Sequence, residues 1–299
     1  MTYLWKPPKE VIEEANVTKY MEEKKFENYR QLVKFSHDNI RKFWSDIVDY
    51  LEIEFFENYK EVLDISDGIE WAKWFVGGKV NVEYNALEKH KTDKLAFIWF
   101  GEKGEIREYS YSQLKDHVSR LANYFKENGV KKGDVIACYM PMLPETVVTL
   151  FASLKIGAVF APIFSGFSPN AVAQRLQDAS PKFLVTCDGY YRRGNLIELK
   201  KNAEKAIELS EKAIKCLIVR RIGENTELSP GQVFFDEAMK SNKLVECEET
   251  EAEDPALLLY TSGTTGKPKG AVITHIGSII QPTKEIFFNM DLKEDGKLL

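Results

Sequence analysis

The feature that most constrains the fold is an alternation of short apolar runs and helical segments that starts at residue 135. The apolar runs cover residues 135–140, 158–163, 183–187 and 216–220. Pro144 and the pair Ser168-Pro169 suit the first turns of two intervening helices, and residues 198–212 form a third helical segment. Nearly continuous apolar strands between helices are typical of a parallel sheet that is covered on both faces. The sequence therefore predicts an α/β fold with mostly parallel sheets flanked by helices.

The region before this alternation has two parts. The apolar run 95–100 reads as a strand, a glycine-containing turn follows, and residues 105–109 return as a second strand. Ser110, with Gln113 at the capping-box position, then begins a helix that Gly129 ends. The first eighty or so residues are helical and rich in aromatic side chains. One apolar stripe at helical spacing contains Ile40, Phe43, Trp44, Ile47, Val48 and Leu51. We expect residues 1–90 to form a helical extension packed on a partial α/β domain at 91–299.

Composition narrows the function. The net charge is -5 at a sequence pI near 5.6, which excludes a basic surface that follows a nucleic-acid backbone. Anionic substrates must then be held by local lysines, arginines or backbone N–H groups. Residues 1–14 lack the apolar core of a signal peptide, and no apolar run reaches about 18 residues. These observations predict a cytoplasmic chain without a transmembrane helix. The acid-rich segment 246–253 is expected to be a solvated connector.

The cysteines and histidines do not suggest a catalytic or metal site. No two of the four cysteines stand at metal-ligand spacing, and three of them adjoin apolar runs, so we expect structural thiols instead of a catalytic or disulfide role. These residues are Cys138, Cys187, Cys216 and Cys247. His275 has no nucleophile or acid aligned with it, so it is interpreted as a packing or helix-start residue. The sequence identifies no catalytic residue and no metal ligand.

A loop between two apolar runs carries the chemistry. It contains four hydroxyl residues, three glycines and two lysines within residues 261–270. Glycines let backbone N–H groups approach a bulky anion, hydroxyls donate hydrogen bonds to phosphate oxygens, and lysine adds a compact positive charge. The candidate phosphate-binding residues are Thr261, Ser262, Gly263, Thr264, Thr265, Gly266, Lys267 and Lys269.

This loop is not a Walker-type P-loop. Pro268 stands where the second glycine of that motif would have to be, and the loop runs from strand to strand instead of opening a helix. The alternative is a surface turn without function. A simple turn does not require four hydroxyls and paired lysines, so a phosphate cradle explains the composition better.

Residues 260–270 resemble the signature loop of the adenylate-forming superfamily, which includes acyl-CoA synthetases, luciferases and peptide-synthetase adenylation domains. In that family the loop holds the β- and γ-phosphates of ATP. Residues 73–87 resemble the N-terminal module of acetyl- and propionyl-CoA synthetases. Residues 154–169, with Phe164 and Gly166 in a turn, resemble the same branch, where this turn lies near bound CoA.

The resemblance also implies a CoA contact after residue 187. The matching loop of acetyl-CoA synthetases carries two arginines that meet the 3′-phosphate and adenine end of CoA. Arg192 falls on the first, and Asn195 stands where the second would be, so the anion contact is either weaker or supplied by Arg193. A solvated pair of surface arginines is the alternative.

The resemblance implies an AMP-forming acyl-CoA synthetase that uses ATP, CoA and Mg²⁺, with acetate or propionate as favoured acids. It covers the whole chain but only about the first half of a family member. The Mg²⁺-linked acid, the ribose-binding aspartate and the C-terminal lysine lie beyond it, so we expect no acyl-CoA synthesis by this chain alone. Three alternatives stay open. The chain is half of an enzyme completed by a second chain, a non-catalytic nucleotide- or CoA-binding module, or the remnant of a truncated gene.

Overall fold

The computed structural model describes residues 5–223, 225–261 and 268–299. The chain forms two compact units and passes between them at Gly78 and Lys79 and again at His275 and Ile276. The larger unit spans 79–275, and the smaller one combines the N-terminal segment with residues 276–299. The domain boundary expected near residue 90 stays a prediction.

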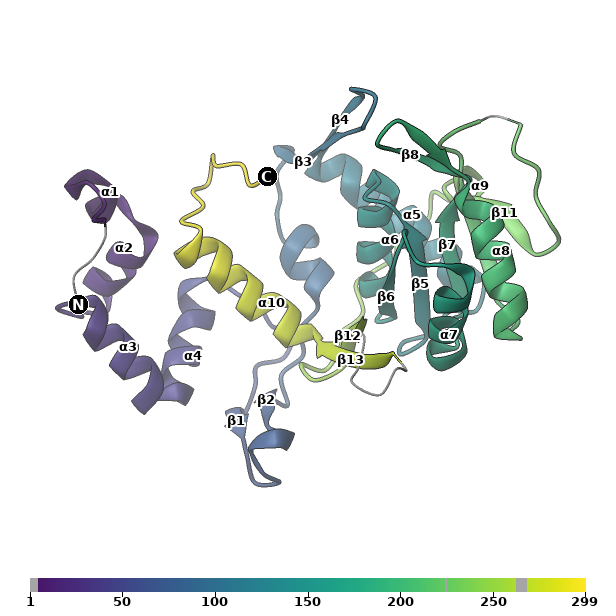
Figure 1. The fold of residues 1–299 in the computed structure, drawn as a ribbon. Coiled ribbons are helices and arrows are strands. Elements are labelled where there is room, and N and C mark those ends of the chain that lie inside the picture. The colour runs from purple at the N-terminus through teal and green to yellow at the C-terminus, as the bar shows by residue number, and fades with distance from the viewer. Residues whose placement is uncertain (1–4, 224, 262–267) are drawn as a thin grey trace. The chain divides into compact units, whose positions relative to one another are not determined.

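Among the described residues, the larger unit contains a seven-stranded sheet with the order β11-β10-β7-β5-β6-β12-β13 (Figure 1). Every neighbouring pair runs parallel except β12 and β13, which confirms the predicted mostly parallel sheet. The strands are β5 (Val135–Met140), β6 (Val159–Phe164), β7 (Phe183–Cys187), β10 (Lys215–Val219), β11 (Gln232–Phe234), β12 (Pro255–Thr261) and β13 (Lys269–Thr274).

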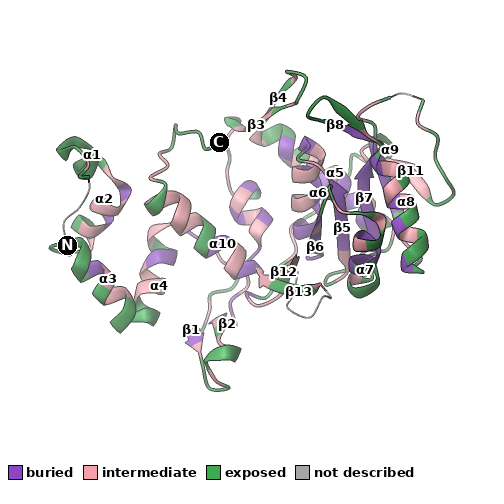
Figure 2. Ribbon diagram, viewed as in Figure 1, coloured by how far each residue is buried: buried purple, intermediate pink, exposed green. Residues whose placement is uncertain are grey.

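Helices cover both faces of this sheet. The helices α5 and α6 pack against each other, α7 and α8 pack against each other, and Figure 1 shows the sheet between the two pairs. These helices are α5 (Tyr111–Glu127), α6 (Pro144–Lys155), α7 (Pro169–Ala179) and α8 (Leu199–Ser210), and the short α9 (Phe235–Ala238) contacts α5. Buried residues occupy the inner strands and parts of the flanking helices (Figure 2). Burial on both faces is the physical reason for the continuous apolar runs.

The predicted helix boundaries are confirmed where capping chemistry set them. The Ser110 hydroxyl accepts a hydrogen bond from the Gln113 N–H, and the Gln113 side chain accepts one from the Ser110 N–H. Gly129 follows α5 with a φ of +85°, a conformation that suits glycine. The predicted strand pair before α5 forms the antiparallel hairpin β3 (Leu95–Phe100) and β4 (Ile106–Ser110).

The smaller unit is mainly helical at its N-terminal end. It contains α1 (Lys9–Glu14), α2 (Asn16–Glu23), α3 (Tyr29–Asp38), α4 (Ile40–Tyr50), the antiparallel pair β1 (Glu61–Asp64) and β2 (Lys73–Val76), and the short helical turns Ile69–Trp71 and Glu285–Asn289. The helix α10 (His275–Lys284) continues into it. The predicted stripe lies on α4, where Ile47 and Val48 are buried while Ile40 stays exposed. Tyr20, Leu32 and Ile47 form the centre of this small core.

The acid-rich segment 246–253 is not merely the solvated connector that we expected. Glu246, Glu249 and Glu251 are exposed, but Thr250 and Ala252, on either side of Glu251, are buried. The Thr250 carbonyl accepts a hydrogen bond from the Val80 N–H at 2.8 Å, and the Glu248 N–H donates to the Lys155 carbonyl at the end of α6. The Asn81 side chain also donates to the Glu248 carbonyl. The segment is therefore fixed to the domain through its backbone, while only its acidic side chains face the solvent.

Candidate ligand-binding site

The loops that follow the parallel strands gather at one edge of the sheet. The chain runs from β5 to β6 on one side and then to β7, β10 and β11 on the other side of β5. Because these strands are parallel, their carboxyl ends lie at the same edge, and β12 ends there as well. Ligands of doubly wound sheets bind outside the carboxyl ends where the strand order reverses. Both groups of residues predicted to bind ligands lie on segments that leave this edge.

The predicted phosphate loop connects β12 to β13. Thr261, the last residue of β12, pairs directly with Lys269, the first residue of β13, in an antiparallel register. The predicted residues Ser262, Gly263, Thr264, Thr265, Gly266 and Lys267 lie outside the described residues. The strand pairing brings the two ends of the loop together, and both Thr261 and Lys269 are exposed. The strand-to-strand connection expected from the sequence is confirmed.

Tyr260 holds the base of this loop against α7. Its hydroxyl donates a hydrogen bond to Asp178 Oδ2 at 2.6 Å. Burial and the Asp178 carboxylate raise the pKa of the Tyr260 hydroxyl, so it remains a proton donor at neutral pH. The guanidinium of Arg175, one turn earlier on α7, lies 5.6 Å from the centroid of the same ring. Tyr260 is therefore fixed both at its hydroxyl and at its ring face.

The turn after β6 presents an aromatic ring to solvent. Phe164 is 57% exposed, and its ring stands edge-on to Phe167 at a centroid distance of 5.5 Å. The Arg192 guanidinium lies 5.9 Å from the Phe164 centroid. A Cβ on Gly166 would come within 2.5 Å of the Phe164 ring, so only glycine leaves this ring in place. The structure thus brings Phe164, Gly166 and Arg192 together, although the sequence separates them by almost thirty residues.

The segment with the two predicted arginines is a β-hairpin and not the loop that we expected. Strand β8 (Tyr190–Arg192) pairs with β9 (Asn195–Ile197), and Arg192 lies opposite Asn195. Arg193 and Gly194 form the two-residue turn with φ values of +51° and +76°, as in the tight turns that join twisted strands. The Asn195 side chain donates to the Arg193 carbonyl at 3.4 Å. Asn195 therefore supports the hairpin turn beside the two arginines.

Sequence reasoning missed Asp188, which fixes this edge of the sheet. Asp188 is buried directly after β7, and its carboxylate accepts hydrogen bonds from backbone N–H groups of its own loop and of the loop after β10. The N–H donors belong to Gly189, Arg221, Ile222 and Gly223, and the Thr226 hydroxyl also donates. An aspartate immediately after a buried strand was the available signal. Its charge is satisfied within the protein, so its role is to hold the two loops together.

A second set of contacts braces the β8–β9 hairpin. Glu102, in the β3–β4 turn, accepts a hydrogen bond from the Gly194 N–H at 2.7 Å. The Lys103 ammonium lies 3.4 Å from the centroid of the Tyr191 ring. These residues come from a turn that sequence analysis interpreted only as a connection. The brace fixes the tip that carries Arg192 and Arg193.

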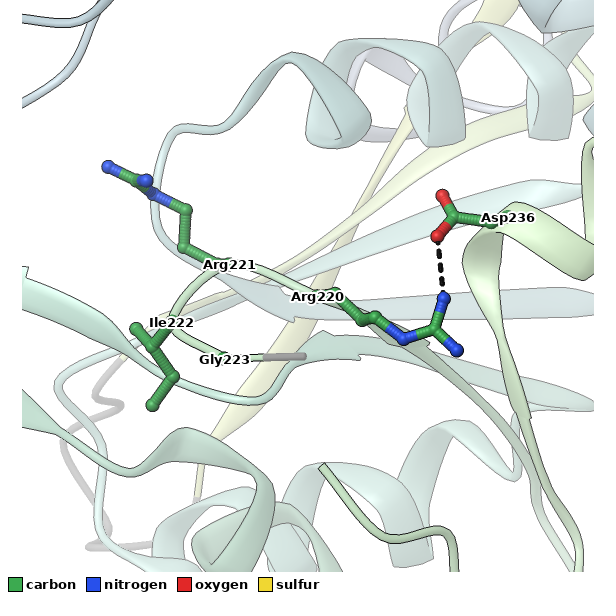
Figure 3. Close-up of a pocket in the computed structure, with 5 residues that line it drawn as sticks. All are labelled: Arg220, Arg221, Ile222, Gly223 and Asp236. Carbon is green, nitrogen blue, oxygen red and sulfur yellow. Dashed lines mark hydrogen bonds and ion pairs between the residues drawn. The ribbon is translucent and has the colours of Figure 1, made fainter. Parts of the chain in front are cut away.

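An open cavity of about 570 Å³ lies beside the loop after β10 (Figure 3). Figure 3 shows Arg220 and Asp236 pointing toward each other, with an ion pair at 2.9 Å, while Arg221 points away. Arg221 pairs instead with Glu105. Ile222 and Gly223 complete the lining. Both arginines are already paired with carboxylates, so this cavity is a weaker candidate for an anion than the hairpin at Arg192.

The buried cysteines and His275 lie where the surrounding protein disfavours their charged forms. Cys138, Cys187 and Cys216 are buried free thiols, and burial raises the pKa of Cys138 and of Cys216 to about 12. His275 begins α10, is fully buried, and has a pKa lowered to about 4 by burial, in agreement with the predicted packing role. Within the described ranges, no three His, Cys, Asp or Glu side chains are grouped to hold a metal ion. In the same ranges every helix is too short or too polar to cross a bilayer.

The sheet order and the helices on both faces define a doubly wound α/β protein. Residues 83–298 match the family model described as AMP-binding enzyme, and residues 29–86 match the model of the acetyl-coenzyme A synthetase N-terminus. The chain therefore belongs to the AMP-binding enzyme family, as the signature loop predicted.

Several characterised proteins resemble the chain. It is 35% identical over 305 residues to acetyl-coenzyme A synthetase of Methanothrix thermoacetophila. The alignment covers 98% of this chain and 45% of that protein. It is 38% identical to 3-hydroxypropionyl-coenzyme A synthetase of Sulfurisphaera tokodaii, over 91% of this chain and 42% of the relative. The solved structure of acetoacetyl-CoA synthetase from Streptomyces lividans shares the fold with a TM-score of 0.91 at 24% identity, over 98% of this chain and 46% of that one. The chain thus spans less than half the length of these relatives.

Proposed function

We propose that this chain forms the ATP- and CoA-binding portion of an AMP-forming acyl-CoA synthetase. One arrangement carries the proposal. Thr261 and Lys269 pair with each other at the two ends of the phosphate loop. This loop follows β12, which ends at the same edge of the sheet as the strand that leads to Phe164 and its contact with Arg192. Family membership and the N-terminal module support it.

In the proposed reaction, a carboxylate oxygen attacks the α-phosphorus of ATP and pyrophosphate leaves, which gives an acyl-adenylate. The CoA thiolate then attacks the acyl carbon and AMP leaves with the bonding electrons. The residues of this chain act by binding and orientation, because loop hydroxyls and lysines hold the pyrophosphate side while the Phe164–Arg192 pair receives the CoA nucleotide. Mg²⁺ would neutralise phosphate charge when bound. Within the described ranges no three His, Cys, Asp or Glu side chains are grouped to hold a metal ion, and no step here is assigned to Mg²⁺.

We propose a short-chain acid, such as acetate or propionate, as the carboxylate substrate. The match of residues 29–86 to the acetyl-coenzyme A synthetase N-terminus supports this choice. The names of two similar proteins, acetyl- and 3-hydroxypropionyl-coenzyme A synthetase, point to acids of two or three carbons.

Calorimetric titration with ATP tests the phosphate loop. We expect the double variant Gly266→Pro/Lys269→Ala to lose at least about tenfold in ATP affinity. The variant removes the Lys269 charge together with a backbone N–H that could approach the phosphates. Lys215→Ala, which removes a lysine that bonds to Asn128, is the control and should bind ATP like the parent chain. Unchanged ATP affinity in the loop variant would remove the basis of the assignment.

Comparing CoA with 3′-dephospho-CoA tests the second half of the site. Arg192→Gln should weaken CoA binding by about tenfold but leave the binding of dephospho-CoA nearly unchanged, since an Arg–phosphate contact disappears only with the first ligand. Arg193→Gln is the matched control from the same turn. A larger loss of CoA affinity in Arg193→Gln would assign the phosphate contact to Arg193 instead. Equal CoA affinity of the parent chain and both variants would exclude both arginines.

Turnover separates the open alternatives. We expect the isolated chain to bind ATP and CoA but to give no ATP–pyrophosphate exchange with acids of increasing length. Co-expression with any downstream reading frame that encodes the remaining fold should restore exchange, with a maximum at two or three carbons. Robust exchange by the isolated chain would show that its own residues suffice, and absence of ligand binding would favour the gene remnant.

A further inference from the structure

Arg175 on α7 is a buried cation that no carboxylate neutralises among the described residues. Arg175 is only 6% exposed, and its Nε has no hydrogen-bond partner in the described ranges. Its Nη1 donates to the Ala171 carbonyl at 2.6 Å. Two aromatic rings face the guanidinium, with the centroid of Phe167 at 4.2 Å and that of Tyr260 at 5.6 Å. Aromatic faces therefore supply much of the electrostatic stabilisation of this cation.

The two rings belong to different parts of the candidate site. Phe167 lies in the turn that carries Phe164 and Gly166, and its carbonyl accepts a hydrogen bond from the Tyr139 hydroxyl at 2.7 Å. Tyr260 is the penultimate residue of β12 and directly precedes Thr261, where the phosphate loop begins. The guanidinium thus bridges the turn of the CoA side and the strand of the ATP side.

An apolar side chain would fill the space between the two rings at a lower desolvation cost than a guanidinium. Burial lowers the pKa of the Arg175 guanidinium, because desolvation disfavours the charged form. Replacement of buried charge by well-packed apolar groups is often neutral or stabilising. Packing alone therefore gives little reason for an arginine here, whereas a planar cation fixes the positions of both rings.

We propose that Arg175 is a positioning residue that couples the turn of residues 164–168 to the base of the phosphate loop, so that both ligand-binding segments are held in one geometry. The identity of the ligands in this inference rests on the proposed function. The coupling itself rests only on the contacts of Arg175, Phe167 and Tyr260.

Hydrogen exchange tests the coupling without any ligand. In Arg175→Met, we expect amide exchange to become faster both in residues 162–169 and in residues 256–261. Leu176→Ala is the matched control, because it truncates a fully buried neighbour on the same helix and leaves the guanidinium in place. The control should not single out these two segments. Arg175→Lys, which keeps the charge but not the planar group, should fall between the parent and Arg175→Met. It carries the same test if Arg175→Met does not fold.

Calorimetry with ATP and with CoA adds the functional readout. Arg175→Met should weaken the binding of each ligand by about 3- to 30-fold, the range expected for loss of one or two cation–π contacts. Leu176→Ala should bind both within about twofold of the parent under conditions where it is folded.

Three outcomes are distinguishable. The inference is overturned if exchange changes in only one segment or in neither, or if Leu176→Ala weakens both ligands as much as Arg175→Met does. If both segments respond but the parent chain binds neither ATP nor CoA, the coupling stands and the proposed function fails. Parallel changes in exchange and in both affinities support the two together.

Discussion

At the residue scale, buried ionisable side chains of the larger unit make its stability depend on pH and on ion pairs. His275 and Lys155 are both almost fully buried; the sequence indicated a packing role for His275 but did not single out Lys155. Their environments differ, because Lys155 contacts carboxylates while His275 Nε2 has no hydrogen-bond partner among the described residues. The two residues therefore lead to different predictions.

His275 should make the fold less stable in mild acid. Burial lowers its pKa to about 4 from an ordinary value near 6.5. Between these values the unfolded chain takes up a proton that the folded chain does not, so the free energy of unfolding falls as the pH falls, by up to about 3 kcal/mol. Urea unfolding between pH 7 and pH 4.5 measures this slope. His275→Asn keeps an acceptor for the Val82 N–H and should show a smaller slope, and an unchanged slope would contradict the assignment.

Lys155 should be essential for stability through its charge. Its ammonium lies 3.2 Å from Glu83 and 2.9 Å from Glu88. Burial alone would lower the pKa of Lys155, but these carboxylates raise it above its ordinary value. Lys155→Met leaves Glu83 buried without its cation and should cost about 3–5 kcal/mol. In denaturant unfolding, the double variant Lys155→Met/Glu83→Gln should lose less than the sum of the single variants. Strict additivity would show that the two side chains do not interact.

At the scale of elements, short hairpins and turns shape the candidate site, and they were harder to predict than the sheet. The β8–β9 hairpin has strands of three residues, and its turn reads Arg-Gly instead of the favoured Asn-Gly. Periodicity cannot reveal such short strands. By contrast, β5 and β7 and the start of α5 were predicted correctly, because continuous burial and capping side chains leave a strong local pattern.

The turn after β6 allows a prediction at this scale. Gly166→Ala places a Cβ against the Phe164 ring, which is exposed and can rotate away from Arg192. We expect CoA affinity to fall by about 3- to 10-fold while the free energy of unfolding changes by less than about 1 kcal/mol. Gly223→Ala, where a Cβ meets open space, is the control. Titration calorimetry and urea unfolding give the two quantities, and an unaltered CoA affinity would count against a role for the Phe164 ring.

At the scale of the whole molecule, the smaller unit joins segments from opposite ends of the chain. Asn16, which is buried, donates to the carbonyls of Phe287 at 2.8 Å and Leu292 at 3.0 Å. The Lys293 ammonium bonds to the Asn16 side chain and to the Glu14 carbonyl. These polar contacts fix the C-terminal segment against the N-terminal helices. No local sequence pattern indicates these contacts, since the partners lie more than 270 residues apart.

Asn16→Ala should release this connection. It leaves two partly buried carbonyls without their donor, so we expect a loss of about 1–3 kcal/mol in the stability of the smaller unit. Hydrogen exchange should become faster in residues 285–293. Asn289→Ala, which removes an exposed amide from the same region, should leave both quantities nearly unchanged. Equal effects of the two variants would show that the buried contacts are not important.

The sequence by itself determined the mostly parallel sheet, the strand-to-strand phosphate loop, the helix caps and the family. Each of these leaves a local pattern, because burial on both faces, backbone turns and capping hydrogen bonds depend on residues close together in the chain. Tertiary structure alone decided which side chains meet, as in the Phe164–Arg192 pair, the Asp188 network, the Lys155–Glu83 ion pair and the Phe167–Arg175–Tyr260 stack. These contacts depend on how the strands are ordered in the sheet, and that order follows from the packing of the whole core and not from the sequence of any one segment.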